Sequence, residues 1–467
     1  MKVLSSGTNQ ALGLGAYAIE FLAKGNPSKE IIQRVKLWHT DLTVTSISYL
    51  RQNINPSLEC FKNEALMYKN ILGGFLYDNS EKISAEKAVM FNIKTILQAY
   101  DDGLGYNSMP LYYPIAMMAA QQRETSGINA LKGMLLVEEI RARLKEVLQI
   151  HPCLDEFICG GIACVTTYGA LIGVTENQID QAIGLFIKRL PNPDMNLTPN
   201  PSEIAELSIV CIIKVILGQL GPENIFQKSI FKNHTFDITL PMDGNDFHIL
   251  SQNYRLGIYY YPFSTAIEAF FSLIRKERNI IRDLHSIENI TFQVSPHLFP
   301  LLTKKKSSKS AFRTNYWSLP YTISLLINKL YENKDNSNTF NHLENIYKST
   351  ALNYNDFFDS QGFEVKQFVE KIQVVCGEGD KYKGDWACSV KVSLKNRNLE
   401  SSIHEKHSGG ANFQGMAIPN IMYTKARKLV AGFTAGPALL LSKLDRMDTE
   451  DEVDLGLVYD LPRLYRK

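Results

Sequence analysis

The stretch Ala99-Tyr-Asp-Asp-Gly-Leu-Gly105 ends a helical pattern that spans residues 85–100. Two adjacent carboxylates, Asp101 and Asp102, precede a glycine, and this combination is typical of a chain that turns after a helix. A second apolar helix is predicted over residues 114–122. The carboxylate pair therefore lies at the start of a loop between two predicted helices.

Helical periodicity dominates the chain outward from this stretch, from residue 11 to about residue 257. Helices are predicted over residues 12–23, 27–42, 64–76, 85–100, 114–122, 127–144, 166–172, 175–190 and 202–220. Several of these helices are apolar on most faces, which is typical of helices buried among others. The pattern therefore predicts a large α-helical domain.

The pattern changes after Tyr261-Pro262. A helix over 263–274 is followed by strand-like alternation in 287–294, with Ile290, Phe292 and Val294 on one face. Further segments are predicted as a helix over 322–331, strands over 371–375 and 387–394, and helical structure from 418 onward. This part of the chain therefore predicts a smaller α+β domain.

Composition excludes several classes of function. The chain has 467 residues, 45% hydrophobic and 21% charged, with a net charge of +2, so no strong field attracts nucleic acid or a membrane surface. Its seven cysteines are scattered, which predicts reduced thiols and a cytoplasmic protein. No cysteine or histidine spacing predicts a metal or iron–sulfur site, and Gly409-Gly410 lacks the spacing of a dinucleotide-binding loop.

Five motifs in order resemble those of the MmgE/PrpD family, which includes 2-methylcitrate dehydratase, cis-aconitate decarboxylase and iminodisuccinate epimerase. They are the Asp101-Asp102 stretch with its helices, Leu171-Ile-Gly-Val-Thr-Glu-Asn-Gln178, Tyr261-Pro262 with Ala266-Ile-Glu-Ala269, Ser318-Leu-Pro-Tyr321, and the return loop Ser408-Gly-Gly-Ala-Asn412. The resemblance implies an all-helical domain built from both chain ends, over 1–260 and 412–467, with an α+β lid domain inserted at 261–411. It also implies a homodimer that acts on a small molecule without a cofactor.

The resemblance implies a set of site residues. The implied catalytic residues are Asp101, Asp102, His151 and Tyr259, and the implied substrate-binding residues are Asn107, Met109, Tyr260, Tyr261, Ser318, Tyr321 and Gly409. Each has a structural alternative. Asp-Asp-Gly also ends a helix, His151 also fits a surface loop before proline, the tyrosines also fit a packed hinge, and Ser318 also fits a helix cap. His404 and His407, which precede the return loop, are further candidates.

The proton-transfer groups of the family are largely missing at the matching positions. Asn107 or Met109 stands where histidine is expected, Pro199 to Glu203 contains no histidine, and Ile258 to Tyr260 contains no lysine. Fewer cations make a polycarboxylate harder to bind, because a desolvated carboxylate needs a partner. We therefore expect a divergent lyase or isomerase that dehydrates, shifts a double bond or cyclises a relatively apolar metabolite that bears a carbonyl or carboxylate, in specialised metabolism. The alternatives are a catalytically silent homologue that serves as a binding partner, and an enzyme for small polycarboxylates.

Overall fold

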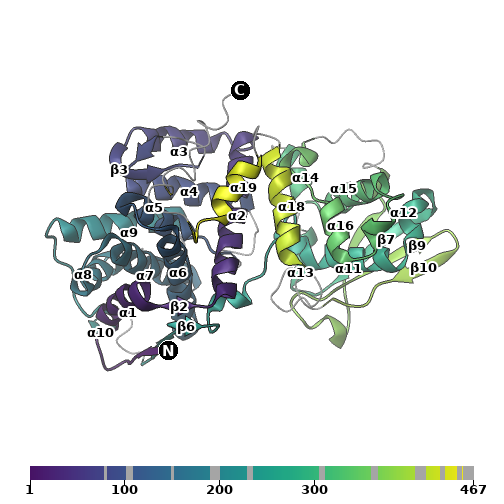
Figure 1. The fold of residues 1–467 in the computed structure, drawn as a ribbon. Helices are drawn as coiled ribbons and strands as arrows, with labels where there is room; N and C mark the ends of the chain where they lie inside the picture. Colours follow the sequence, from purple (N-terminus) through teal and green to yellow (C-terminus); the bar gives the residue numbers. More distant parts are fainter. Residues whose placement is uncertain are drawn as a thin grey trace. The chain divides into compact units, whose positions relative to one another are not determined.

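The computed structural model describes residues 1–77, 81–100, 109–148, 152–189, 200–228, 235–303, 311–358, 367–404, 417–431, 437–449 and 455. Contacts divide the chain into two compact units, shown in Figure 1. The first unit contains residues 1–99, 110–251 and 434–467, and the second contains residues 100–109 and 252–433. Helices make up most of the residues that the structure describes, as the sequence predicts.

The first unit consists mainly of helices around a buried centre. Its helices are α1 (Gln10–Lys24), α2 (Lys29–Arg51), α3 (Ser57–Leu66), α4 (Ala85–Tyr100), α5 (Tyr113–Arg123), α6 (Gly127–Val147), α7 (Pro152–Ile172), α8 (Glu176–Ile187), α9 (Pro201–Ile216), α10 (Ile225–Lys228) and α19 (Pro437–Asp445). The central helix is α7, which packs against α1, α5, α6, α8 and α9. Its segment Asp155–Ile172 has the length and composition to cross a bilayer, but 83% of it is buried inside the protein, as expected of a core helix.

Three short strand pairs complete the first unit. Strand β1 (Lys2–Leu4) pairs with β5 (Ile238–Leu240), β2 (Asn26–Pro27) with β6 (Asp243–Gly244), and β3 (Lys69–Phe75) with β4 (Lys82–Ile83). The β3 strand corrects the sequence prediction of a helix over 64–76. A Cβ atom on Gly73 would lie 1.7 Å from the carbonyl oxygen of Ile83, so glycine is required where the two strands meet. The glycine pair at 73–74 therefore indicates a strand, although the apolar spacing of this segment predicts a helix.

The second unit combines helices with a four-stranded sheet. Its helices are α11 (Ser264–Lys276), α12 (Asn279–Arg282), α13 (Leu298–Thr303), α14 (Ala311–Tyr316), α15 (Leu319–Glu332), α16 (Leu343–Ser349) and α18 (Ile418–Ala431). The sheet order is β10-β9-β7-β8, from β7 (Ile287–Val294), β8 (Ile372–Cys376), β9 (Cys388–Leu394) and β10 (Arg397–Glu400). Within this sheet β7 and β8 pair in parallel, and the β7–β9 and β9–β10 pairs are antiparallel. The predicted inward face of β7 is confirmed, because Ile290, Phe292 and Val294 are fully buried.

The two C-terminal helices belong to different units. Helix α18 packs against α16 in the second unit, and α19 packs against α2 in the first (Figure 1). The sequence boundaries at 260/261 and 411/412 assign both helices to one helical domain. The division by contacts instead places residues 252–433 together, so α18 lies with the sheet-containing unit.

A buried carboxylate on α6 holds the segment that precedes the second unit. Arg143 Nε donates to Glu139 Oε1 at 2.7 Å, and the backbone N–H of His248 donates to Glu139 Oε2 at 2.7 Å. His248 begins η2 (His248–Ser251), a short 3₁₀ helix. Burial raises the pKa of Glu139 from 4.5 to about 7, although Arg143 and the His248 N–H oppose this rise.

This shift predicts a pH-dependent contribution to stability. Because the folded state holds the Glu139 proton more tightly than the unfolded chain, this contribution is complete below about pH 4.5. It falls as the pH rises to about 7, by at most roughly 3 kcal/mol. In the Glu139→Gln variant, the free energy of unfolding should change less between pH 5 and 8 than in the wild type, as measured by urea denaturation. The control, Glu59→Gln, alters an exposed carboxylate on α3 of the same unit and should leave the pH profile unchanged. A profile in the Glu139→Gln variant as steep as in the wild type would contradict the prediction.

Candidate functional site

Several sequence-predicted site residues lie outside the residues that the structure describes. These are Asp101, Asp102, Asn107, His151, His407 and Gly409. Their proposed roles stay predictions. Met109, the first described residue after the carboxylate loop, is buried.

The three consecutive tyrosines Tyr259, Tyr260 and Tyr261 are buried in the second unit. The Tyr260 ring meets Phe263 edge-on at 5.2 Å between centroids, and the Tyr261 ring meets Trp386 at 5.7 Å. Such edge-to-face pairs stabilise a packed interior. The rings of Tyr260 and Tyr261 therefore pack against other aromatic side chains, as in a structural segment. Contact of either ring with a ligand stays a prediction.

Ser318 and Tyr321 lie at the start of α15. The Ser318 hydroxyl accepts a hydrogen bond from the Tyr321 N–H at 3.2 Å, so Ser318 caps this helix. Tyr321 is buried, and its ring lies 6.3 Å from that of Phe357, which also contacts Tyr316 at 5.2 Å. Tyr316 in turn donates to the Tyr259 carbonyl at 3.1 Å. The structure therefore links two predicted site tyrosines, Tyr259 and Tyr321, through neighbouring aromatic side chains.

Two buried cations lie next to Tyr100, the residue before Asp101. Arg255, 1% exposed, donates through Nη1 to the Tyr100 carbonyl at 3.0 Å and to the Tyr316 hydroxyl at 2.7 Å. Its guanidinium carbon lies 4.1 Å from the centroid of the Tyr100 ring, a cation–π contact. Lys425, 0% exposed, donates to the Arg255 carbonyl at 2.8 Å and lies 5.9 Å from the same ring. Positive charge is therefore concentrated around Tyr100, which belongs to the second unit together with both cations.

A carboxylate and an imidazole meet in the same unit. Glu268, on α11, is 3% exposed, and its Oε1 lies 3.8 Å from Nδ1 of His404. This is an ion-pair distance and is too long for a hydrogen bond. Among the described residues, neither Glu268 Oε2 nor His404 Nε2 has a hydrogen-bond partner, although both atoms are buried. A buried polar atom without a hydrogen-bond partner needs an explanation, and a catalytic role is one.

The backbone of His404 is held firmly. Its N–H donates to the Cys388 carbonyl at 2.8 Å, and the Cys388 N–H donates to the His404 carbonyl at 2.9 Å. Cys388 begins β9, and α11 packs against β9. The sheet and helix together therefore place the imidazole opposite Glu268.

Tyr259 lies within electrostatic reach of Glu268. Burial raises the pKa of Tyr259 above its ordinary value, Arg255 opposes this rise, and the charge of Glu268 adds to it. A phenol in this environment stays protonated at neutral pH and can donate a hydrogen bond. We refer to Tyr100, Arg255, Tyr259, Glu268, Tyr316, His404 and Lys425 as the Tyr259 cluster.

The cavity described beside Tyr259 is small. It is lined by apolar side chains that include Phe271 and Leu326, and its volume is about 10 Å³, enough for one water molecule. On this side of Tyr259 the protein is therefore closely packed, and no metabolite fits there.

Sequence reasoning identified Tyr259 and His404 and missed Glu268, Arg255 and Lys425. Glu268 is the one charged residue in the segment 264–274, and its apolar neighbours in α11 predict burial of the carboxylate. Lys425 shares the apolar stripe of Ile421 and Leu429 at helical spacing. Single charges on apolar helix faces are thus the signal that would have found two of these residues.

The described residues contain no group of three or more His, Cys, Asp or Glu side chains arranged to hold a metal ion. The cysteines at 60, 159, 164, 211, 376 and 388 are free thiols. In comparisons with known proteins, no family model matches this chain, and no curated protein matches it.

Proposed function

We propose that this protein is a divergent MmgE/PrpD-like lyase or isomerase that acts, without a cofactor, on a metabolite bearing a carbonyl or carboxylate. The observation that supports this proposal best is the buried pair Glu268–His404, whose outer atoms lack hydrogen-bond partners among the described residues. Unpartnered acid–base groups beside a buried tyrosine favour proton transfer over a purely structural role.

The chemistry would begin with proton abstraction next to a carbonyl. His404 Nε2 takes the proton, and the electron pair of the C–H bond moves into the carbonyl to give an enolate. Glu268 stabilises the resulting imidazolium, and the Tyr259 hydroxyl donates a hydrogen bond to the enolate oxygen. Return of the proton from His404 to a different carbon shifts the double bond, while loss of a β-substituent that accepts this proton completes an elimination.

The buried cations bear on the choice of substrate. Arg255 and Lys425 place two positive charges in the same unit as the acid–base pair, and positive charge lowers the energy of an enolate. They favour a substrate that carries at least one carboxylate over a wholly apolar one. Members of the family that act on polycarboxylates are compatible with this preference.

The alternative function is that of a catalytically silent homologue with a binding role. The small cavity beside Tyr259 and the close packing of Tyr260 and Tyr261 favour this alternative. The two proposals differ in one measurable property, because only an enzyme exchanges a substrate C–H proton with solvent.

Proton exchange provides the test of the proposed function. The full chain would be incubated in D₂O with a panel of hydroxy acids, unsaturated di- and tricarboxylates, β-keto acids and apolar enones. NMR would follow the loss of C–H signals and the appearance of new olefinic signals. We expect exchange with at least one carboxylate-bearing compound. Binding of a compound, measured by thermal shift, without exchange of any of its protons would support the silent alternative.

The carboxylate pair of the predicted loop gives a further prediction. Asp102→Asn should lower turnover at least about tenfold, the scale of losing a positioned acid or base, without unfolding the protein. Circular dichroism would check the fold, and the exchange assay would measure the rate. The control is Asp335→Asn, an exposed position of the second unit. Full activity of Asp102→Asn would place the chemistry elsewhere.

A further inference from the structure

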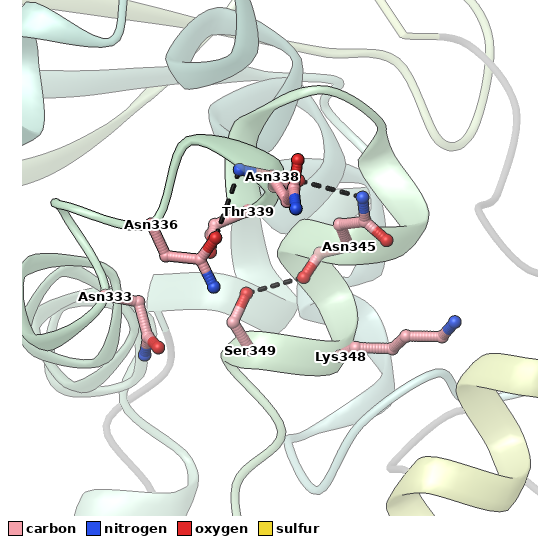
Figure 2. A pocket seen from close by; sticks show the side chains of 7 residues that line it. All are labelled: Asn333, Asn336, Asn338, Thr339, Asn345, Lys348 and Ser349. Atoms are coloured by element: carbon pink, nitrogen blue, oxygen red, sulfur yellow. Dashed lines mark hydrogen bonds between the residues drawn. The ribbon is translucent and has the colours of Figure 1, made fainter.

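A polar hollow lies on the second unit where the end of α15 meets α16 and η5 (Ser337–Phe340), as Figure 2 shows. Its volume is about 480 Å³, within the range of small-molecule sites. Every lining side chain is polar, and asparagine supplies four of them, at 333, 336, 338 and 345. Thr339, 4% exposed, is the most buried lining residue.

Internal hydrogen bonds orient the four amides, and Figure 2 marks some of them. Asn336 Oδ1 accepts from the Asn338 N–H at 3.1 Å, and Asn345 Nδ2 donates to the Asn338 carbonyl at 2.8 Å. Asn333 Nδ2 donates to the Lys329 carbonyl at 2.8 Å, at the end of α15. Asn338 Oδ1 accepts from Asn341 Nδ2 at 3.4 Å. Each amide thus uses one of its two polar ends within the protein.

The other polar end of each amide makes no hydrogen bond to the residues that the structure describes. The two spare donors are the Nδ2 groups of Asn336 and Asn338, and the two spare acceptors are the Oδ1 atoms of Asn333 and Asn345. Because the internal bonds set the orientation of each amide, little side-chain entropy is lost when a ligand binds. The hollow therefore presents oriented donors and acceptors together.

The lining excludes other classes of ligand. Lys348 is the one cation in the lining, and it forms an ion pair with Glu344 at 2.5 Å, so little charge remains for a phosphate. No carboxylate lines the hollow, which disfavours a divalent metal. The lining has no apolar side chain that would bind a hydrophobic ligand.

We propose that this hollow binds a neutral sugar, as a monosaccharide or as the end residue of a short oligosaccharide. Each sugar hydroxyl both donates and accepts hydrogen bonds, which matches amides that offer donors and acceptors side by side. The site lies outside the Tyr259 cluster and does not depend on the proposed acid–base function.

Titration of the full chain with neutral sugars tests this proposal. The probes are the methyl glycosides of glucose, galactose, mannose and N-acetylglucosamine, together with maltose and sucrose, followed by calorimetry and saturation-transfer NMR. Glucose 6-phosphate serves as the anionic probe. We expect saturable binding of at least one neutral sugar, and weaker binding of glucose 6-phosphate than of the methyl glycoside of glucose.

Two variants separate recognition from folding. Asn336→Asp and Asn338→Asp keep the acceptor oxygen that each side chain uses internally, and they replace the spare N–H donors with a charged carboxylate oxygen that cannot donate. Each should weaken sugar binding at least tenfold, about 1.4 kcal/mol. Asn70→Asp is the matched control for the added charge, because the Asn70 Oδ1 likewise accepts the N–H of the residue two positions on, Leu72, at 3.0 Å, within β3 of the first unit. Absence of saturable binding by every sugar, equal affinity in both variants, or tighter binding of glucose 6-phosphate would each overturn the proposal.

Discussion

His404→Asn is expected to lower the rate of substrate proton exchange by about 10²- to 10⁴-fold, the usual contribution of a positioned acid or base. Asparagine keeps a polar group near Glu268 but cannot accept a proton at neutral pH. His285→Asn, at an exposed position of the same unit, is the control and should exchange at the wild-type rate.

Glu268→Gln separates an acid–base role from a structural one. Glu268 is buried, and one of its oxygens has no hydrogen-bond partner among the described residues, so the charge costs folding free energy. If Glu268 serves catalysis, removing its charge should slow exchange while the melting temperature stays equal or rises. A lower melting temperature with an unchanged exchange rate would instead mean that Glu268 stabilises the fold.

Full exchange activity in the His404→Asn variant would show that His404 takes no part in the proposed proton transfer.

The secondary structure could be predicted from the sequence wherever periodicity and end signals agree. Strand β7 alternates apolar and polar residues, and α2 begins at the capping residue Ser28, whose hydroxyl accepts the Ile31 N–H at 3.3 Å. The segment 64–76 was predicted wrongly because its apolar spacing fits a helix, while its glycine pair fits a close strand contact. Local spacing alone could not show that Gly73 faces Ile83 across a hairpin.

The candidate site was harder to predict, because its charged groups come from segments without a motif. Cations are expected at the motif positions where the family has histidine or lysine. Arg255 lies four residues before Tyr259, and Lys425 comes from α18, so neither lies at such a position. Both cations lie near Tyr100 because of tertiary packing, and the local sequence pattern around each residue does not predict this packing. The expectation that positive charge has been lost therefore holds for the motif positions and does not extend to the whole second unit.

Arg141→Met is expected to have the largest effect on stability. Arg141 is buried in the first unit, and it donates to Glu138 Oε2 at 2.6 Å and to Glu156 Oε1 at 3.0 Å. Lys145 also donates to Glu156, at 2.6 Å. Removal of the guanidinium leaves two buried carboxylates with one remaining ammonium, which typically costs about 3–5 kcal/mol. Chemical denaturation would measure the loss, and Arg123→Met, at an exposed position, should change stability little.

The pH dependence of this loss identifies its cause. Burial favours a higher pKa for Glu156, but Arg141 and Lys145 outweigh it and lower this pKa to about 2, whereas burial raises the pKa of Glu138. In the wild type, the Glu156 contribution is present above its ordinary pKa and is lost as the pH falls toward 2. Without Arg141 both carboxylates bind protons more readily, so the deficit of Arg141→Met should shrink as the pH falls from 7 to 5. Adding Glu138→Gln should recover part of the deficit at pH 7, because it removes one uncompensated charge. A deficit that is constant with pH and unaffected by Glu138→Gln would mean that Arg141 stabilises the core by packing alone.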